Sequence, residues 1–239
     1  MGNELKGLFG GFGGVIAAAC LEGTMGRVRA SASGRSAAAE IGDFAFFAGE
    51  ADGDLLSGCA AAILVPQTAA WAAAIERTAP GARRFTRYAF GAAPGPEELP
   101  RLRKLGAAPP GFELRRLDGE MAALCRAEEW SRDLAPGHVG ENYEGFVLLS
   151  GGELCAGAAA YARSRGGVEI EVDTRPDMRR RGLARCCAAR YIAGCLERGL
   201  YPEWDAHTAV SAALAEGLGY SRRREYAAYL AAGGQDADL

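Results

Sequence analysis

The feature that most constrains this chain of 239 residues is a junction at 174–184, where an extended segment gives way to a helix. Residues 168–174 (VEIEVDT) alternate apolar and polar side chains with a period of two, which predicts a strand. Pro176 cannot continue that strand, and helical spacing begins at about Gly182. The first amides of a helix have no partner within the helix and carry the positive end of its dipole. Such a turn is typical of a phosphate site.

Arginines gather at this junction although the chain as a whole is slightly acidic. The chain has 27 lysines and arginines against 30 aspartates and glutamates, which gives a formal net charge of −3. Residues 175–190 hold six arginines and one acid, Asp177. The overall charge provides no field that would hold nucleic acid, so we expect no nucleic-acid partner. The local charge favours an anionic ligand at the turn, although a solvated basic turn would have the same composition.

Motifs on both sides of the junction resemble those of the GNAT superfamily of acyl-CoA N-acyltransferases. The superfamily signature, Q/R-x-x-G-x-G/A at a strand-to-helix turn, is matched by RRRGLA at 179–184. The other ordered motifs are VEIEVDT (168–174), YPEWDAH (201–207) and LAEGLGY (214–220), and the weaker matches are GDFAFFAG (42–49), ILVPQ (63–67) and EWSRD (129–133). Together they are similar to the bacterial branch that includes the zwittermicin resistance acetyltransferase.

This resemblance implies an α/β protein with the GNAT fold and an N-terminal α/β extension. In that superfamily the acyl-CoA lies in a V-shaped opening between the fourth and fifth strands, which here would be 168–174 and 201–205. The co-substrate would be acetyl-CoA, with its pyrophosphate on the amides at about 180–184. The residues that we expect to bind it are Val172, Asp173, Thr174, Arg179, Arg180, Arg181, Gly182, Leu183, Ala184, Thr208 and Ser211. No metal is expected, because two histidines and no C-x-x-C pair make a poor ligand set.

Direct transfer to an amine requires a base, because an ammonium group has no lone pair with which to attack. The period of two places Glu169, Glu171 and Asp173 on one face of the predicted strand. Carboxylates this close repel one another, which can raise the pKa of one of them towards neutrality. We expect Glu171, and after it Glu169, to act as the catalytic base, with His207 as a second base or substrate contact. The alternative is a solvated sheet face whose acids pair with neighbouring arginines.

Two residues depart from the superfamily pattern on the helix predicted at 208–218. Thr208 stands where many members have Asn, so one hydrogen-bonding oxygen is kept and the amide donors are lost. Ala215 stands where many members have a tyrosine whose phenol protonates the leaving thiolate. We assign no general acid; the groups that could replace it are Tyr161, Tyr220, Tyr226 and water.

The first half of the chain is less regular and indicates a mixed α/β part. We expect strands at 15–20, 44–47, 62–65 and 84–90, and a helix at 68–75. Five prolines between residues 91 and 111 surround a short basic helix at 97–105 and mark a domain seam. The expected division is an N-terminal α/β domain at 1–105 and a GNAT acyltransferase domain at 106–239.

The sequence therefore predicts an N-acetyltransferase that transfers acetyl from acetyl-CoA directly to a primary amine of a small molecule, such as an aminated antibiotic or metabolite. The alternative is an acyl-CoA-binding sensor or assembly protein that has lost catalysis, as Ala215 would permit. Seven cysteines without a C-x-x-C pair favour a reducing cytoplasm, and the resemblance implies a bacterial protein. No apolar run is long enough to span a membrane, so no membrane partner is expected.

Overall fold

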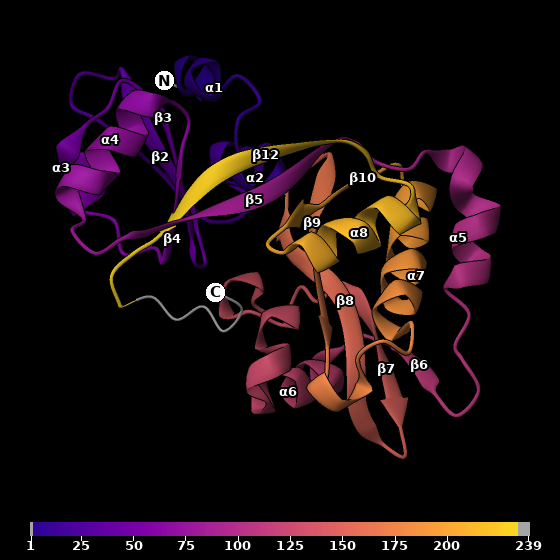
Figure 1. Ribbon diagram of the computed structural model, residues 1–239. Coiled ribbons are helices and arrows are strands. Elements are labelled where there is room, and N and C mark those ends of the chain that lie inside the picture. The colour runs from indigo at the N-terminus through magenta and orange to yellow at the C-terminus, as the bar shows by residue number, and fades with distance from the viewer. Residues whose placement is uncertain (1, 234–239) are drawn as a thin grey trace.

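The computed structural model describes residues 2–233 as two β-sheets with helices packed around them (Figure 1). The larger, seven-stranded sheet consists of β1 (Arg27–Ala30), β2 (Ser36–Ile41), β3 (Phe44–Gly49), β4 (Ile63–Pro66), β12 (Ser221–Leu230), β5 (Arg83–Ala92) and β11 (Asp205–Ala206), in that spatial order. The smaller, five-stranded sheet consists of β10 (Tyr201–Glu203), β9 (Gly167–Thr174), β8 (Glu153–Arg163), β7 (Gly145–Ser150) and β6 (Glu113–Arg116).

Helices bury the two faces of the smaller sheet. On one face, Leu183 and Tyr191 pack in one buried cluster with Val168 and Ile170 of β9. On the other face, the helix that contains Met121 covers β7 and β8. The helices are α1 (Gly2–Phe9), α2 (Gly14–Glu22), α3 (Gly53–Ser57), α4 (Ala69–Thr78), α5 (Leu99–Leu105), α6 (Gly119–Ala127), α7 (Leu183–Glu197) and α8 (Ala209–Leu218). None of these described helices has the length and apolar character that a membrane span would need.

The last strand that the structure describes, β12, lies inside the sheet of the N-terminal half. β12 pairs antiparallel with β4 on one side, where Tyr229 faces Leu64, and with β5 on the other, where Glu225 faces Tyr88. Figure 1 shows the yellow β12 running alongside β5. The larger sheet therefore takes strands from both sides of residue 105, and the division at 105/106 stays a prediction.

The prediction of a strand at 15–20 is wrong, because this segment is the middle of helix α2. Gly13 begins the helix in the left-handed conformation, with φ of 80°. The helix is buried on several sides, since Ile16 and Ala17 pack against β2 and residues such as Val15 are also buried. In a short apolar run, periodicity cannot distinguish a buried helix from a buried strand. This run contains no polar residues whose spacing would have indicated a helix.

The strand predicted at 201–205 is two short strands that belong to different sheets. β10 runs parallel to β9, with Glu203 beside Glu169. After the buried Trp204 this segment no longer pairs with β9. Asp205 instead pairs with Ala89 of β5 in the larger sheet. Beyond Glu169, β9 has no strand partner among the described residues on the side of β10, and this is where the predicted fold would have its V-shaped opening.

The strand predicted at 168–174, the helix predicted from about Gly182 and the helix predicted at 208–218 are present, and so are the strands predicted in the N-terminal half at 44–47, 62–65 and 84–90. The prediction missed the β1–β2 hairpin and helices α1 and α3. β2 was missed because it is rich in alanine and contains a glutamate, Glu40, which is buried and paired with Arg27 and Arg29 of β1. The residue pattern of β2 by itself does not show this pairing, because the arginines lie on another strand.

We expect the two halves to unfold together, because β12 lies between strands of the N-terminal half. Ile75→Val should lower the free energy of unfolding by about 1 kcal/mol, since it removes a buried methyl group from a side chain with 0% exposure. Hydrogen exchange of β8 amides should then become about fivefold faster, although β8 is in the other sheet. Val210→Ala, at a position that is 81% exposed, is the control. Unchanged exchange in β8 would show that the halves unfold independently.

Candidate active site

The turn between β9 and α7 exposes backbone amides. A 3-10 turn, Pro176–Met178, follows β9, and Gly182 then begins α7 with φ of 78°. The amide of Cys186 donates to Gly182 O over 3.1 Å, so the amides of Leu183 and Ala184 precede the first hydrogen bond of the helix. A Cβ on Gly182 would find only an Arg185 nitrogen within 4 Å, at 3.8 Å. The N-terminus of α7 is therefore accessible to a ligand.

The side chains around this turn supply positive charge and an unused hydroxyl. Arg179, Arg180 and Arg181 are exposed at the turn. Arg175 differs from them, because it pairs with Asp177 over 2.7 Å and with Glu153. Thr174 Oγ1 at the end of β9 is buried without a hydrogen-bond partner in the part of the chain that the structure describes. Free amides, arginines and a buried hydroxyl without a partner fit the pyrophosphate and amide groups of an acyl-CoA.

Glu169 belongs to a buried pair of carboxyl groups rather than to an open surface. Its Oε1 accepts a hydrogen bond from the Asp205 amide over 3.0 Å, and its side chain is close to that of Glu203. Glu203 in turn accepts from the amide of Val15 in the first turn of α2. Burial, and next the charge of Glu203, raises the pKa of Glu169 well above its ordinary value, and burial also raises the pKa of Glu203. This pair joins β9, β10 and α2 where the two sheets meet.

Glu171 lies two residues further along β9 and has different neighbours. Burial, and next the negative charge of Asp133, raises its pKa to about 7, while the Val172 amide and Arg87 lower it. The Val172 amide donates to Glu171 Oε1 over 3.1 Å. Tyr161 of β8 is also near enough for the charge of Glu171 to raise the pKa of its phenol. A carboxyl group with a pKa of about 7 can accept a proton at neutral pH.

A buried arginine connects the strand ends near His207. Arg87 of β5 is 6% exposed and donates from Nε to Asp205 Oδ1 over 2.8 Å. Its Nη1 lies 3.1 Å from His207 Nδ1, and its Nε also donates to the Tyr226 hydroxyl over 3.2 Å. The His207 ring packs on Phe85, with 5.1 Å between ring centroids. Sequence reasoning missed Arg87; the available signal was the period of two, which places Arg87 on the same face of the strand as Phe85 and Ala89.

The polar residues predicted at the start of α8 make contacts within the protein. Thr208 Oγ1 accepts from the Ser211 amide over 3.1 Å and so caps the helix. Ser211 Oγ accepts from the Trp204 indole over 3.1 Å. Ala215 is fully buried in the cluster that also contains α7. Binding of acetyl-CoA by Thr208 and Ser211 stays a prediction, and the site of the usual tyrosine is part of the core.

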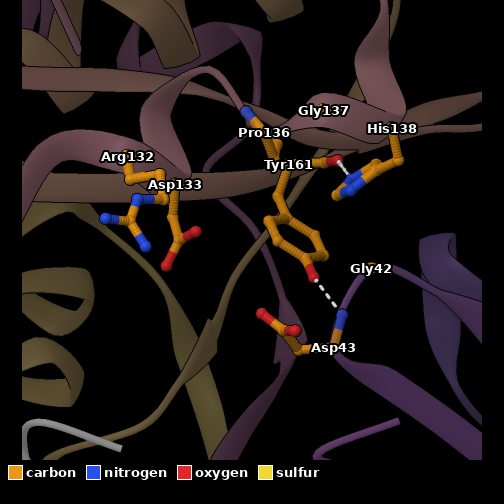
Figure 2. Close-up of a pocket in the computed structure, with 8 residues that line it drawn as sticks. All are labelled: Gly42, Asp43, Arg132, Asp133, Pro136, Gly137, His138 and Tyr161. Atoms are coloured by element: carbon orange, nitrogen blue, oxygen red, sulfur yellow. Dashed lines mark hydrogen bonds between the residues drawn. The ribbon is translucent and has the colours of Figure 1, made fainter. Parts of the chain in front are cut away.

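A pocket of about 340 Å³ lies between the N-terminal half and the smaller sheet (Figure 2). The amide of Asp43 donates to the Tyr161 hydroxyl over 3.1 Å, and His138 Nε2 lies 2.7 Å from the Tyr161 carbonyl oxygen. The lining residues are Gly42, Asp43, Arg132, Asp133, Pro136, Gly137, His138 and Tyr161. The EWSRD motif therefore supplies Arg132 and Asp133 to the pocket, and the GDFAFFAG motif supplies Gly42 and Asp43. No local pattern indicated that these two distant segments would meet.

The buried pair of Glu169 and Glu203 predicts an unusual effect on stability. A carboxyl whose folded pKa is raised holds its proton more tightly in the folded state, so the stability that it contributes falls as pH rises above about 4.5. Glu169→Gln mimics the protonated form and should raise Tm at pH 8 by about 2–4 °C. It should also flatten the fall of Tm between pH 5 and pH 8. Glu50→Gln, at an exposed residue, is the control; a lower Tm for Glu169→Gln at pH 8 would contradict the assignment.

Comparison with known proteins gives one family. A family model described as GNAT acetyltransferase matches residues 6–229. The crystal structure of a GCN5-related N-acetyltransferase-like protein from Streptococcus suis 89/1591 is similar, with a TM-score of 0.89, 41% identity, and coverage of 96% of this chain and 98% of that chain. A GNAT-family structure from Novosphingobium aromaticivorans shares the fold, with a TM-score of 0.57, 21% identity, and coverage of 90% of this chain and 95% of that chain.

A curated relative supports the same assignment over part of the chain. The uncharacterized N-acetyltransferase YdfB of Bacillus subtilis is 30% identical over 129 residues, which are 51% of this chain and 49% of that protein. The chain therefore spans about half the length of this relative. From the match of the family model over nearly all of its length, the chain belongs to the GNAT acetyltransferase family.

Proposed function

We propose that this protein transfers acetyl from acetyl-CoA directly to a primary amine of a small molecule, such as an aminated antibiotic or metabolite. The observation that carries the proposal is Glu171, a carboxyl with a pKa of about 7 on the strand that borders the opening between the sheets. A base of this kind is what an amine acceptor needs, and a pKa near the working pH favours proton transfer.

The N-terminus of α7 would hold the diphosphate of acetyl-CoA. The amides of Leu183 and Ala184 would donate to phosphate oxygens, and the exposed arginines of the turn would add positive charge. Thr174 Oγ1 would find its missing partner in the pantetheine arm. When bound, acetyl-CoA supplies an activated acetyl group, and no other cofactor is needed.

The Val172 amide is the candidate donor to the thioester carbonyl oxygen. In the structure it donates to Glu171 Oε1. In the proposed reaction it would bond the carbonyl oxygen, on which negative charge develops, and such a donor contributes about 3 kcal/mol to transition-state stabilisation. The same exchange would free the Glu171 carboxylate to accept the proton of the amine.

The other predicted catalytic residues have supporting roles in this proposal. Glu169 is a positioning residue, because its carboxyl group holds the Asp205 amide and Glu203 at the base of the opening. His207 contacts Arg87 at the end of β11 and is the second base or a substrate contact. The thiols of α7 are not nucleophiles here, because burial raises the pKa of Cys187 well above its ordinary value.

The alternative function is that of an acyl-CoA-binding sensor or assembly protein. The buried Ala215 favours it, since the usual proton donor to the thiolate is absent from that place on α8. Release of CoA thiol over a panel of primary amines separates the two functions. Binding of CoA without turnover on any amine would favour the sensor.

We propose the cytoplasm of a bacterium as the site of this activity. The seven cysteines are free thiols, as expected in a reducing compartment. The similar proteins from Streptococcus suis and Bacillus subtilis support a bacterial origin.

Glu171→Gln tests the base. Transfer to an amine should fall about 10²- to 10⁴-fold in kcat/KM, because the amide cannot accept the proton, while CoA affinity is unchanged. In the wild type, kcat/KM should rise with pH through the Glu171 pKa of about 7, since only the deprotonated carboxylate is active. That rise should be lost in the variant. Persistence of the rise in Glu171→Gln and its loss in His207→Gln would assign the base to His207.

Gly182→Val tests the amide turn. Valine is strained at φ of 78°, at a cost of about 1–3 kcal/mol, so the turn would change shape and measurable CoA binding should be abolished. The fold should persist, because the new side chain enters open space. Gly194→Ala, within the same helix, should bind CoA normally in isothermal titration. Wild-type affinity in Gly182→Val would refute the assignment of the turn.

A further inference from the structure

Arg87 makes a hydrogen bond with one ring nitrogen of His207, and this contact limits what the ring can do. Arg87 Nη1 lies 3.1 Å from His207 Nδ1. A guanidinium group has five N–H donors and no acceptor, and it keeps its proton in proteins. Burial opposes the charge of Arg87, but Asp205 and Tyr226 outweigh this effect and raise the pKa of Arg87 above its ordinary value. Nδ1 is therefore the acceptor, and the hydrogen of the neutral ring is on Nε2.

The guanidinium group is held from several sides and cannot turn away from the ring. Its Nε donates to Asp205 Oδ1 over 2.8 Å, and its Nη2 donates to the Asp205 carbonyl oxygen over 3.1 Å. It also lies over the ring of Phe44, 4.9 Å from the centroid. Arg87 follows Phe85 by two residues on the same face of β5, and the His207 ring packs on Phe85. The ring is therefore placed by packing and oriented by a hydrogen bond.

The other two protonation states of the ring do not fit this contact. With a hydrogen on Nδ1, or on both nitrogens, an N–H of His207 would point at an N–H of Arg87. A doubly protonated ring would also be a cation next to a buried cation. The other titratable groups that bond to Arg87 are Asp205 and Tyr226, and Arg87 Nε donates to both.

A base needs a lone pair to accept a proton, and this ring has none to offer. In the form with the hydrogen on Nε2, the ring has a single lone pair, on Nδ1, and that lone pair accepts from Arg87. Nε2 carries a hydrogen and can only donate. The contact therefore excludes one of the two roles expected for His207 and leaves the other, that of a substrate contact.

Arg87 also acts on the candidate base of the site. Burial, and next the charge of Asp133, raises the pKa of Glu171 to about 7, while the Val172 amide and the charge of Arg87 lower it. Glu171 is on β9 and His207 follows β11, so the two residues belong to different sheets. One buried cation therefore influences both residues expected to serve as bases.

We propose that Arg87 is a positioning residue for the acetyl transfer. It holds the His207 ring neutral with its hydrogen on Nε2, so that His207 donates a hydrogen bond to a bound substrate and is not a second base. This inference rests on the proposed function and leaves Glu171 as the group that accepts the proton of the amine. The proton passes from the amine nitrogen to a carboxylate oxygen, and the His207 ring keeps its one hydrogen throughout.

A purely structural role is the alternative, because the ion pair of Arg87 with Asp205 also joins β11 to β5. The double variant Arg87→Met/Asp205→Asn separates the two roles. It removes the contact with His207 without leaving a buried carboxylate alone, which a single substitution of Arg87 would do. A purely structural change would alter Tm, but it would change neither the protonation of the ring nor the pH profile of the enzyme.

Nitrogen NMR of the free protein tests the ring directly. The chain has two histidines, so the signals that are absent from His207→Gln belong to His207. In the wild type near neutral pH, the ring nitrogen that correlates with both Hδ2 and Hε1, which is Nε2, should carry the hydrogen. In the double variant, the pH at which the ring takes up a second proton should rise by about one unit, because Nδ1 is then open to a proton. His138 in the same samples should titrate as in the wild type.

Two NMR results would overturn the inference: a hydrogen on Nδ1 in the wild type, or an unchanged titration of His207 in the double variant. Arg84→Met, at an exposed arginine of the same strand, is the matched control and should leave the His207 signals and their titration unchanged.

The pH profile of acetyl transfer tests the consequence for the reaction. In His207→Gln, kcat/KM should still rise with pH, because Glu171 remains the base. In the double variant, the rise should move to higher pH, since the charge of Arg87 no longer lowers the pKa of Glu171. Loss of the rise in His207→Gln would overturn the inference. Thiol release from no amine would refute the proposed function, while a hydrogen on Nε2 and a shifted titration in the double variant would still support the action of Arg87 on the ring.

Discussion

The arrangement of the site depends on the point after β10 where the chain stops pairing with β9 and joins the larger sheet. Glu203 is still paired with β9, and two residues later Asp205 is paired with β5. The buried ion pair of Arg87 with Asp205 stabilises this separation, and Arg87 stays charged because Asp205 and Tyr226 raise its pKa against the effect of burial. Removing one partner of a buried ion pair typically lowers the free energy of unfolding by about 3–5 kcal/mol, so this pair fixes β11 beside β5 and away from β9. Beyond Glu169, β9 has no partner among the described strands on the side of β10 because the two sheets divide there.

Two neighbouring glutamates of β9 differ in chemistry because their surroundings differ. Glu169 faces Glu203 in a fully enclosed place, where a charge on both groups is unfavourable. Glu171 is half-buried and has Arg87 and the Val172 amide near it, which offset burial and leave its pKa at about 7. One strand can therefore carry a structural carboxyl and a candidate base on the same face.

The sequence predicted strand β9 of the smaller sheet and the turn before α7. Residues 168–174 alternate strictly, Pro176 ends the strand, and Gly182 precedes a helix, so each boundary had a local cause. The prediction failed at 15–20, where an apolar run had no local signal that distinguishes helix from strand. Ala215 stands where many members of the superfamily have a tyrosine, and the structure places this alanine in the core.

The N-terminal contribution to the site could not be predicted in this way. Asp43 approaches Tyr161 where the β2–β3 turn meets β8, and Arg87 approaches Asp205 because β11 pairs with β5. The sequence by itself determined the family, the carboxylate-bearing strand and the amide turn, since these depend on residues close together in the chain. The tertiary structure alone decided which glutamate is enclosed and which acids share the pocket, because a pKa and a cavity depend on groups brought together from distant segments.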